Sequence, residues 1–257
     1  MKTDRPWQVP LAYPNRGKCG LCNKDDESKH IPGPGWKSFQ NAFTPYPYHR
    51  ILVPDTCWEN EKLRSLGGAD TIRTALGYAL AEVKRTRIEP FPIWIFTHVG
   101  YGSGQNFPHH HWHILEPATE PESFLTADDF NQMEATTISE SEHFSAALWG
   151  IKAGQTFIVP KYDTSKSMGA SSLFGDAELL RELAEEMGAI VDLFNQKFNS
   201  PDYCLHLDLS HEYDWFAVYT PILNNWGGTE FIAPYRGTPY TLPWPHKITA
   251  AYLRGEP

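Results

Sequence analysis

The chain has 257 residues, 41% of them hydrophobic, which is enough for one large domain or two small ones with a proper core. Its formal net charge of −9 argues against a nonspecific nucleic-acid binder, which would normally carry a basic face, but not against a small phosphorylated substrate. No apolar run approaches the roughly 20 residues of a membrane span, and the polar N-terminus lacks a signal-peptide centre, so we expect a soluble cytoplasmic protein.

The N-terminal region, residues 1–37, is rich in Pro, Gly, Lys and Asp and predicts a loop. It contains Cys19 and Cys22 in a Cys-x-x-Cys pair, a spacing that fits tetrahedral zinc. Four cysteines in a chain of this length do not make a disulfide framework. The pair alone leaves zinc, redox chemistry and no function at all open.

The first half then predicts strand, helix, strand and turn. The apolar run 51–53, stopped by Pro54, indicates a strand. Residues 70–86 carry apolar side chains on one helical face, and Asp70 can cap the start. Residues 93–96 indicate a second strand, and a glycine-rich turn leads from there into the sequence Phe-Pro-His-His-His-Trp-His-Ile-Leu at 107–115.

Three histidines, His109, His111 and His113, recur at every second residue of that sequence. In an extended strand they share one face, while His110, Trp112 and Ile114 point toward the core. Such a row suits metal binding, or phosphoryl chemistry with His as the nucleophile. Three merely structural imidazoles would be costly to bury unpaired. A metal-holding cupin-like barrel is the alternative from another class, but two strong helices argue against that nearly all-strand fold.

The second half repeats the order of the first. Residues 156–160 echo 50–54, a helix over 176–198 starts at Asp176 as cap, and residues 203–207 and 215–219 indicate strands. The chain therefore predicts an α+β fold of duplicated units, with antiparallel sheets and packed helices. The expected divisions are a catalytic half over 1–116, an acidic connecting segment over 117–145, and a degenerate second half over 146–257 without the triple-histidine strand.

Together these features resemble the histidine-triad superfamily, whose motif His-φ-His-φ-His-φ-φ follows a glycine-rich turn; here it runs from His109 to Leu115. Two such units in one chain are similar to the galactose-1-phosphate uridylyltransferase branch. The likeness is specific around 98–115 and loose after 150. The transferase motif reads His-Pro-His-x-Gln, whereas this chain has His110 and His113, and a third His is the hydrolase pattern. His98 stands where the family has Asn.

The resemblance implies roles for particular residues. His111 matches the nucleophile that attacks the α-phosphorus, and its other ring nitrogen should donate to a backbone carbonyl. His113 would donate to the phosphate or to the leaving group, and His98 would donate a hydrogen bond or add positive charge. The implied substrate-binding residues are Asn41 at the ribose-binding acid's position, Gly104, Gln105 and Asn106 around the phosphate, and Glu230 at the sugar-binding acid's position.

Zinc-bearing relatives have two further ligands besides the Cys pair: a residue just after the strand that ends in Pro, and the first His of the motif. The resemblance thus implies a structural zinc site of Cys19, Cys22, Cys57 and His109, with a His in place of Cys57 as the open alternative.

The expected function is a nucleotidyltransferase or phosphorylase that acts on a nucleotide-linked, nucleotide-sugar-like small molecule through a covalent nucleotidyl-histidine. The third His favours the alternative, a histidine-triad hydrolase of nucleotide phosphoesters or phosphoramidates. A binding protein without turnover is a further alternative, suggested by His98 and Asn106. No nucleic-acid polymer and no membrane partner is expected, and homodimers are common in the superfamily.

Overall fold

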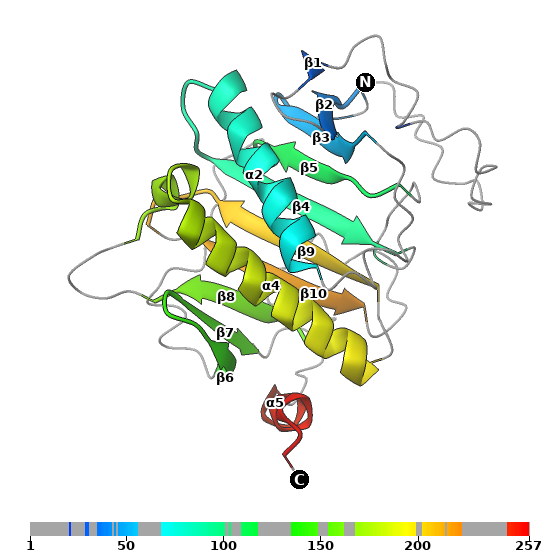
Figure 1. Ribbon diagram of the computed structural model, residues 1–257, viewed down its shortest axis with the longest axis vertical. Helices are drawn as coiled ribbons and strands as arrows, with labels where there is room; N and C mark the ends of the chain where they lie inside the picture. Colours follow the sequence, from blue (N-terminus) through cyan, green and yellow to red (C-terminus); the bar gives the residue numbers. More distant parts are fainter. Residues whose placement is uncertain are drawn as a thin grey trace, which may run out of the picture.

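The computed structural model describes residues 21, 29–30, 35–42, 44, 46–55, 68–100, 103, 109–117, 135–148, 154–161, 168–198, 202–213, 215–222 and 246–256. These residues form one ten-stranded antiparallel sheet with helices packed on it (Figure 1), which confirms the α+β class. The first half contains β1 (Lys29–His30), β2 (Trp36–Gln40), β3 (His49–Pro54), α2 (Ala69–Thr86), β4 (Ile93–Val99) and β5 (Trp112–Leu115). The second contains β6 (Thr136–Glu140), β7 (Phe144–Leu148), β8 (Thr156–Pro160), the 3-10 helix η2 (Ala170–Phe174), α4 (Ala177–Phe198), β9 (Asp202–Leu209), β10 (Phe216–Ile222) and α5 (His246–Arg254).

The strand order is β1-β2-β3-β5-β4-β9-β10-β8-β7-β6. Read outward from the central β4–β9 pair, one half runs β5, β3, β2, β1 and the other β10, β8, β7, β6. Each half also places its long helix after its third strand, α2 after β3 and α4 after β8. β6 and the start of β7 lie within the range expected as a connecting segment, and they pair with the second half through β8.

α2 and α4 lie side by side across one face of the sheet (Figure 1). Burial alternates along β4, where Ile93, Ile95, Thr97 and Val99 are buried beneath the helices. The apolar stripe predicted for α2 is buried as expected. The helices approach closely where Gly188 of α4 meets the start of α2, because a Cβ at Gly188 would lie 2.8 Å from the Ala69 nitrogen. Only glycine fits that crossing without a shift.

The two long helices begin differently. Asp176 caps α4, since its Oδ1 accepts hydrogen bonds from the backbone N–H groups of Glu178 (2.9 Å) and Leu179 (3.0 Å). The cap expected at Asp70 is wrong: α2 starts one residue before it, Gly68 occupies the N-cap position, and no side chain caps the helix. Asp70 instead lies in the first turn.

A buried carboxylate ties α2 to the sheet. Glu82 is fully buried, accepts a hydrogen bond from Ser38 Oγ (2.6 Å), and pairs with Arg50 of β3 (2.5 Å) and Arg85 of its own helix (2.7 Å). Three donors compensate the desolvation of this charge, so removing one partner costs more than an exposed pair would.

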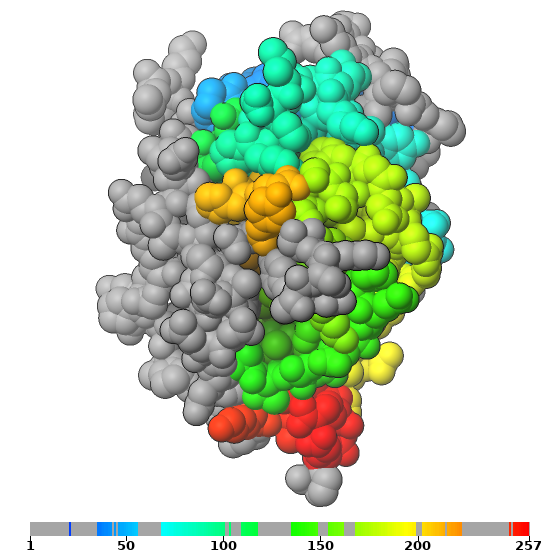
Figure 2. Space-filling view, turned by 90° about the vertical axis from the view of Figure 1, so that its left-hand side faces the viewer, coloured from blue at the N-terminus to red at the C-terminus, as the bar shows by residue number. Residues whose placement is uncertain are grey.

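α5 packs at the far end of the sheet against β6, where Arg254 donates to the Thr137 carbonyl oxygen at 2.9 Å (Figure 2). None of the helices that the structure describes is both long and apolar enough to cross a lipid bilayer.

Candidate active site

The face of the sheet opposite α2 and α4 carries the histidines. On β4 the half-buried side chains Trp94, Phe96 and His98 alternate with the residues beneath the helices. The register places Phe96 opposite His113 of β5 on one side and opposite His206 of β9 on the other. Regular strand structure in β5 begins only at Trp112, so His109 and His111 precede it.

His111 is 5% exposed and has a defined tautomer. Its Nδ1 lies 2.8 Å from the His109 carbonyl oxygen, which can only accept, so Nδ1 carries the proton and Nε2 carries the lone pair. Burial lowers the pKa of His111, and the bond to His109 opposes this only in part, which favours the neutral ring at pH 7. Thr97 Oγ1 donates to the His111 carbonyl oxygen at 2.6 Å and fixes its backbone. The expected hydrogen bond from His111 to a backbone carbonyl is confirmed.

His113 lies beside His111, with 5.0 Å between the two ring centroids. Its ring stacks on Phe96 at 4.8 Å and 16°, and its Nδ1 lies 2.8 Å from His49 Nε2. The sequence suggested His49 as a reserve zinc ligand in place of Cys57, and not as a partner of His113. The β3–β5 pairing, which sets His49 opposite Leu115, is what brings its ring to His113.

Asn41 and Thr44 lie beside the ring of His49. Thr44 Oγ1 lies 2.8 Å from His49 Nδ1, and Asn41 Nδ2 lies 3.3 Å from Nδ1 and 3.4 Å from Nε2. A hydrogen bond from the Thr44 hydroxyl to Nδ1 would leave the Nε2–H of His49 to donate to His113. His113 then presents its own Nε2–H, which suits a phosphate oxygen or a leaving group. Asn41 thus comes into this chain of contacts.

His98 contacts the second half of the chain. Its Nδ1 lies 3.3 Å from Cys204 Sγ of β9, and its ring centroid is 5.8 Å from that of His113. Burial, and then the neighbouring His111 and His206, lower the pKa of His98 to about 3. The lowered pKa favours the neutral ring of His98 and therefore the expected hydrogen-bond role over the added positive charge.

His206 is the residue that sequence reasoning missed. Its ring lies 5.6 Å from Trp94 and 6.1 Å from Phe96, and burial lowers its pKa to about 3. The sequence showed only an apolar strand around Cys204, because the β4–β9 pairing joins residues about 110 apart and leaves no local signal.

The second half has no imidazole at the matching positions of β10. Leu52, two residues before Pro54, is opposite Trp112, and Ile158, two residues before Pro160, is opposite Ala217. Ala217 of β10 therefore corresponds to Trp112 of β5. By the same alignment Val218 corresponds to His113, and Phe216 corresponds to His111. Both are buried apolar side chains. The absence of the histidine row from the second half is confirmed at these positions.

His109 is fully buried and one of its ring nitrogens donates to the Pro54 carbonyl. Burial, and then His111, lower its pKa to about 4, so the ring is neutral and its other nitrogen is an acceptor. Among the described residues no group of three His, Cys, Asp or Glu side chains could hold a metal ion. The other expected metal ligands and four of the expected substrate-binding residues lie outside the described residues: Cys19, Cys22, Cys57, Gly104, Gln105, Asn106 and Glu230.

The core-facing residues of the motif lie as expected. His110 and Trp112 are each 1% exposed, and Trp112 Nε1 donates to His110 Nε2 at 2.8 Å. His110 is therefore a core residue and takes no part in the row of catalytic candidates.

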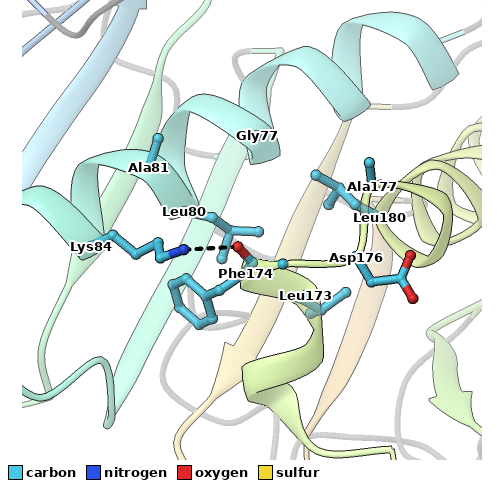
Figure 3. Close-up of a pocket in the computed structure, with 10 residues that line it drawn as sticks. Gly77, Leu80, Ala81, Lys84, Leu173, Phe174, Asp176, Ala177 and Leu180 are labelled. Atoms are coloured by element: carbon cyan, nitrogen blue, oxygen red, sulfur yellow. Dashed lines mark hydrogen bonds between the residues drawn. The ribbon is translucent and has the colours of Figure 1, made fainter.

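A hollow of about 290 Å³ lies on the other side of the sheet, between α2, η2 and α4 (Figure 3). Its lining is mostly apolar, and Lys84 Nζ bridges one side by donating to the Phe174 carbonyl oxygen at 3.1 Å. Asp176 at its rim is already used as the cap of α4. The sheet separates this hollow from His111, so it is not part of the histidine site.

No protein-family model matches the chain, and no curated protein matches it. Several solved structures share its fold. A uridylyltransferase aligns with a TM-score of 0.67 at 14% identity, covering 96% of this chain and 93% of that one. An ADP-glucose phosphorylase from Arabidopsis thaliana, with bound ADP-glucose, aligns with a TM-score of 0.66 at 16% identity, covering 96% and 91%. A GalT-like protein from the same plant aligns with a TM-score of 0.63 at 15% identity, covering 87% and 84%. The chain therefore has the fold of the uridylyltransferases and of ADP-glucose phosphorylase.

Proposed function

We propose that the protein is a nucleotidyltransferase or phosphorylase, and that His111 carries the nucleotidyl group between donor and acceptor. The observation that carries this proposal is the tautomer of His111. Its Nδ1–H is committed to the His109 carbonyl oxygen, so a neutral Nε2 lone pair faces the same side of the sheet as His113 and His98. A neutral, oriented imidazole is what attack on phosphorus needs.

The reaction has two displacements. Nε2 of His111 attacks the α-phosphorus, an N–P bond forms, and the P–O bond to the leaving group breaks. The leaving oxygen departs as the anionic oxygen of the sugar phosphate and accepts a hydrogen bond from the Nε2–H of His113, which keeps its proton. In the second step an oxygen of the acceptor attacks the same phosphorus, a P–O bond forms, and His111 departs with its Nδ1–H unchanged.

A nucleotide sugar is the proposed substrate class. The shared fold supports this, because the similar ADP-glucose phosphorylase was solved with ADP-glucose bound. We assign the enzyme to the galactose-1-phosphate uridylyltransferase-like type and the two halves to a duplication. Supporting the latter, both halves have the same strand order and the same helix position. Gly104, Gln105, Asn106, Asn41 and Glu230 keep their proposed substrate contacts.

A hydrolase of nucleotide phosphoesters or phosphoramidates is the second candidate. The observation that favours it is the His49–His113 contact of 2.8 Å, since an oriented Nε2–H beside His111 can also position a water molecule by donating to its oxygen. In that case water replaces the phosphate acceptor in the second step.

A structural zinc ion is proposed at Cys19, Cys22, Cys57 and His109. The chemistry of His109 fits: one ring nitrogen is oriented by the Pro54 carbonyl, and the neutral ring offers its other nitrogen as a ligand, the usual arrangement for a metal-binding His. The ion would hold the N-terminal region to the strand that leads into His111 and would take no part in either displacement.

The first experiment is intact-mass measurement after incubation with ADP-glucose and UDP-glucose. We expect one nucleoside monophosphate on the wild type, none on His111→Ala, and an unchanged adduct on His211→Ala, which removes an exposed His. An adduct that persists in His111→Ala, or its absence from the wild type with every nucleotide donor, overturns the proposal.

Transfer and hydrolysis are then distinguished by measuring how fast the isolated adduct is lost with and without a phosphate acceptor. Under the transferase reading, orthophosphate or a sugar phosphate accelerates loss of the adduct at least about tenfold over buffer. A loss rate that no acceptor changes rejects transfer and favours the hydrolase.

The zinc proposal is tested by metal analysis. Zinc is expected at one ion per chain in the wild type, lost in Cys19→Ser, and retained in the matched variant Cys204→Ser. Equal zinc in both variants contradicts the ligand set.

A further inference from the structure

His111 lies just outside the regular part of β5. The pairing of β4 with β5 ends at Thr97 opposite Trp112, and β5 itself begins at Trp112. The backbone carbonyl oxygen of His111 accepts its hydrogen bond from a side chain, the Thr97 hydroxyl, at 2.6 Å. Thr97 is 1% exposed, so this bond is made in the core and not in water.

The other half of the sheet shows the same place without a hydroxyl. Leu207 of β9 takes the place of Thr97, as the residues that the two pair with show. There the pairing runs one residue further, because Phe216, which corresponds to His111, still pairs with Asp208. The strand therefore leaves the regular sheet earlier in the half that has the hydroxyl and the imidazole than in the half that has neither.

Packing does not explain a hydroxyl at this position. The other buried residues on the same face of β4 are aliphatic: Ile93, Ile95 and Val99. Burying a hydroxyl costs free energy unless it has a partner, and the partner of Thr97 is the His111 carbonyl oxygen. An aliphatic side chain would fill the space equally well, so the hydroxyl points to a role at His111.

Two hydrogen bonds then determine where the ring of His111 lies. Its Nδ1–H bonds to the His109 carbonyl oxygen at 2.8 Å and orients the ring, while the Thr97 hydroxyl orients the peptide group that follows the ring. Without that hydroxyl the carbonyl must turn to find another donor or stay buried without one. Turning the peptide group moves the ring, and misplacing a reacting atom by roughly 1 Å can cost about 100-fold in rate.

We propose that Thr97 is a positioning residue, whose hydroxyl holds the backbone of His111 outside the regular strand so that Nε2 faces the substrate phosphorus. This inference rests on the proposed function for the reaction, but not for the position of His111 in the protein without substrate. The side chain of Thr97 lies on the face of the sheet beneath the helices, so it acts through His111 and does not itself contact the substrate.

The position of His111 is measured without substrate by NMR of its ring nitrogens, with the signals assigned from a His111→Gln variant. The wild type and Thr97→Ser, which keeps the hydroxyl, should both show one Nδ1–H tautomer. In Thr97→Val the Nδ1–H signal should shift, and its hydrogen should exchange with water at least about tenfold faster, because the bond to the His109 carbonyl opens more often. An unchanged Nδ1–H signal in Thr97→Val overturns the proposal.

The kinetic test compares adduct formation at His111 in two Thr→Val variants. Thr97→Val should lower the maximal single-turnover rate about 10- to 100-fold, with the half-saturating substrate concentration changed less than about twofold. Thr97→Ser should retain most of the rate. Thr156→Val is the matched control, because Thr156 is also fully buried and its hydroxyl donates to the Gly154 carbonyl oxygen at 3.2 Å in the other half. Its rate should equal that of the wild type, and an equal loss in both variants would show a merely structural role.

Failure of this inference and failure of the proposed function give different results. If the wild type forms no adduct, the proposed function falls, while the NMR signal still judges the position of His111. If Thr97→Val does not fold, as its thermal midpoint would show, Thr97→Ala takes its place. Thr97→Ala and Thr97→Ser differ only in the hydroxyl oxygen, so equal Nδ1–H signals in that pair overturn the proposal.

Discussion

The ring of His113 is held between Phe96, on which it stacks at 4.8 Å, and His49, whose Nε2 lies 2.8 Å from its Nδ1. The stack fixes the plane of the imidazole and the hydrogen bond fixes its tautomer. Two restraints of different kinds therefore hold this side chain in one orientation.

Replacing His49 with Ala should slow adduct formation at His111 roughly 10- to 100-fold, because His113 then presents its donor only part of the time. Substrate KM should change little. Single-turnover kinetics on the intact mass measures the rate. Thr44→Val, which removes only the outer contact to His49 Nδ1, is the milder control. Equal rates in the wild type and in His49→Ala would show that His113 does not need His49 to orient it.

The sequence predicted the residues whose pattern is local. The alternation from His109 to His113 identified the motif, and the role of His110 and Trp112 in the core followed from it. His206 and the Cys204 contact could not be predicted, because they depend on the pairing of β4 with β9 across more than a hundred residues. The contact of His49 with His113 could not be predicted either, because it depends on the pairing of β3 with β5.

At the scale of elements, the two long helices carry an instructive pair of aspartates. Asp176 precedes α4 and accepts two backbone N–H bonds, whereas Asp70 lies inside the first turn of α2 and pairs with exposed Arg73 at 3.0 Å. The same residue type precedes or begins both predicted helices. Asp176 caps α4, whereas Asp70 does not cap α2, because that helix starts one residue before it.

Asp176→Ala should lower the free energy of unfolding by about 1 kcal/mol, the usual cost of losing an N-cap. Asp70→Ala should cost less than about 0.5 kcal/mol, because its ion pair is exposed. Urea unfolding of both variants measures the difference. If Asp70→Ala proved the costlier change, our assignment of the caps would be wrong.

The turn between β6 and β7 is joined to α4 by a titrating pair. His143 Nδ1 lies 2.5 Å from Glu182 Oε2, and the hydrogen bond to Glu182 raises the pKa of His143 above its ordinary value. A raised folded pKa means that the stabilisation is fully present below the unfolded pKa, about 6.5, and is lost as the pH rises through the folded pKa.

Glu182→Gln should therefore lower the thermal midpoint at pH 6 and have almost no effect at pH 9. The pair is partly exposed, so the difference corresponds to less than about 1 kcal/mol. Glu178→Gln is the matched control, because its partner Arg181 does not titrate in this range. A Glu182→Gln effect that is equal at both pH values would contradict the linkage.

Both helices and the strands nearest to them were predicted from periodicity, since their apolar faces repeat every three to four residues or every second residue. β2 and β7 were not, because they are short and their identity depends on pairing with β3 and β8. Edge strands such as β6 have little apolar pattern to read, with no fully buried side chain along Thr136–Glu140.

For the molecule as a whole, the two halves share one sheet and one core. β4 pairs with β9 along its whole length at the centre of the sheet, and the core is continuous from Leu52 in one half to Phe144 in the other. The division at residue 116 stays a prediction, and the continuous core leads us to expect that the two halves unfold together.

We expect the full chain to unfold in a single calorimetric transition, and residues 1–116 expressed alone to show no cooperative transition, because β4 would become an exposed edge. Co-expression of 1–130 with 131–257 should restore a folded complex. A cooperative transition for 1–116 by itself would mean that the halves are independent domains.

The pairing of β4 with β9 at the centre of the sheet has a consequence for the substitutions that the protein can accept. Where two identical subunits meet about a two-fold axis, every substitution appears on both sides of the interface at once. Here β4 and β9 meet in a similar way but belong to one polypeptide, so each strand can be altered separately. Trp94 and His98 line one side of that pairing, and Cys204 and His206 line the other. The two strands can therefore diverge independently, and here β9 carries a thiol at the position that pairs with an imidazole of β4.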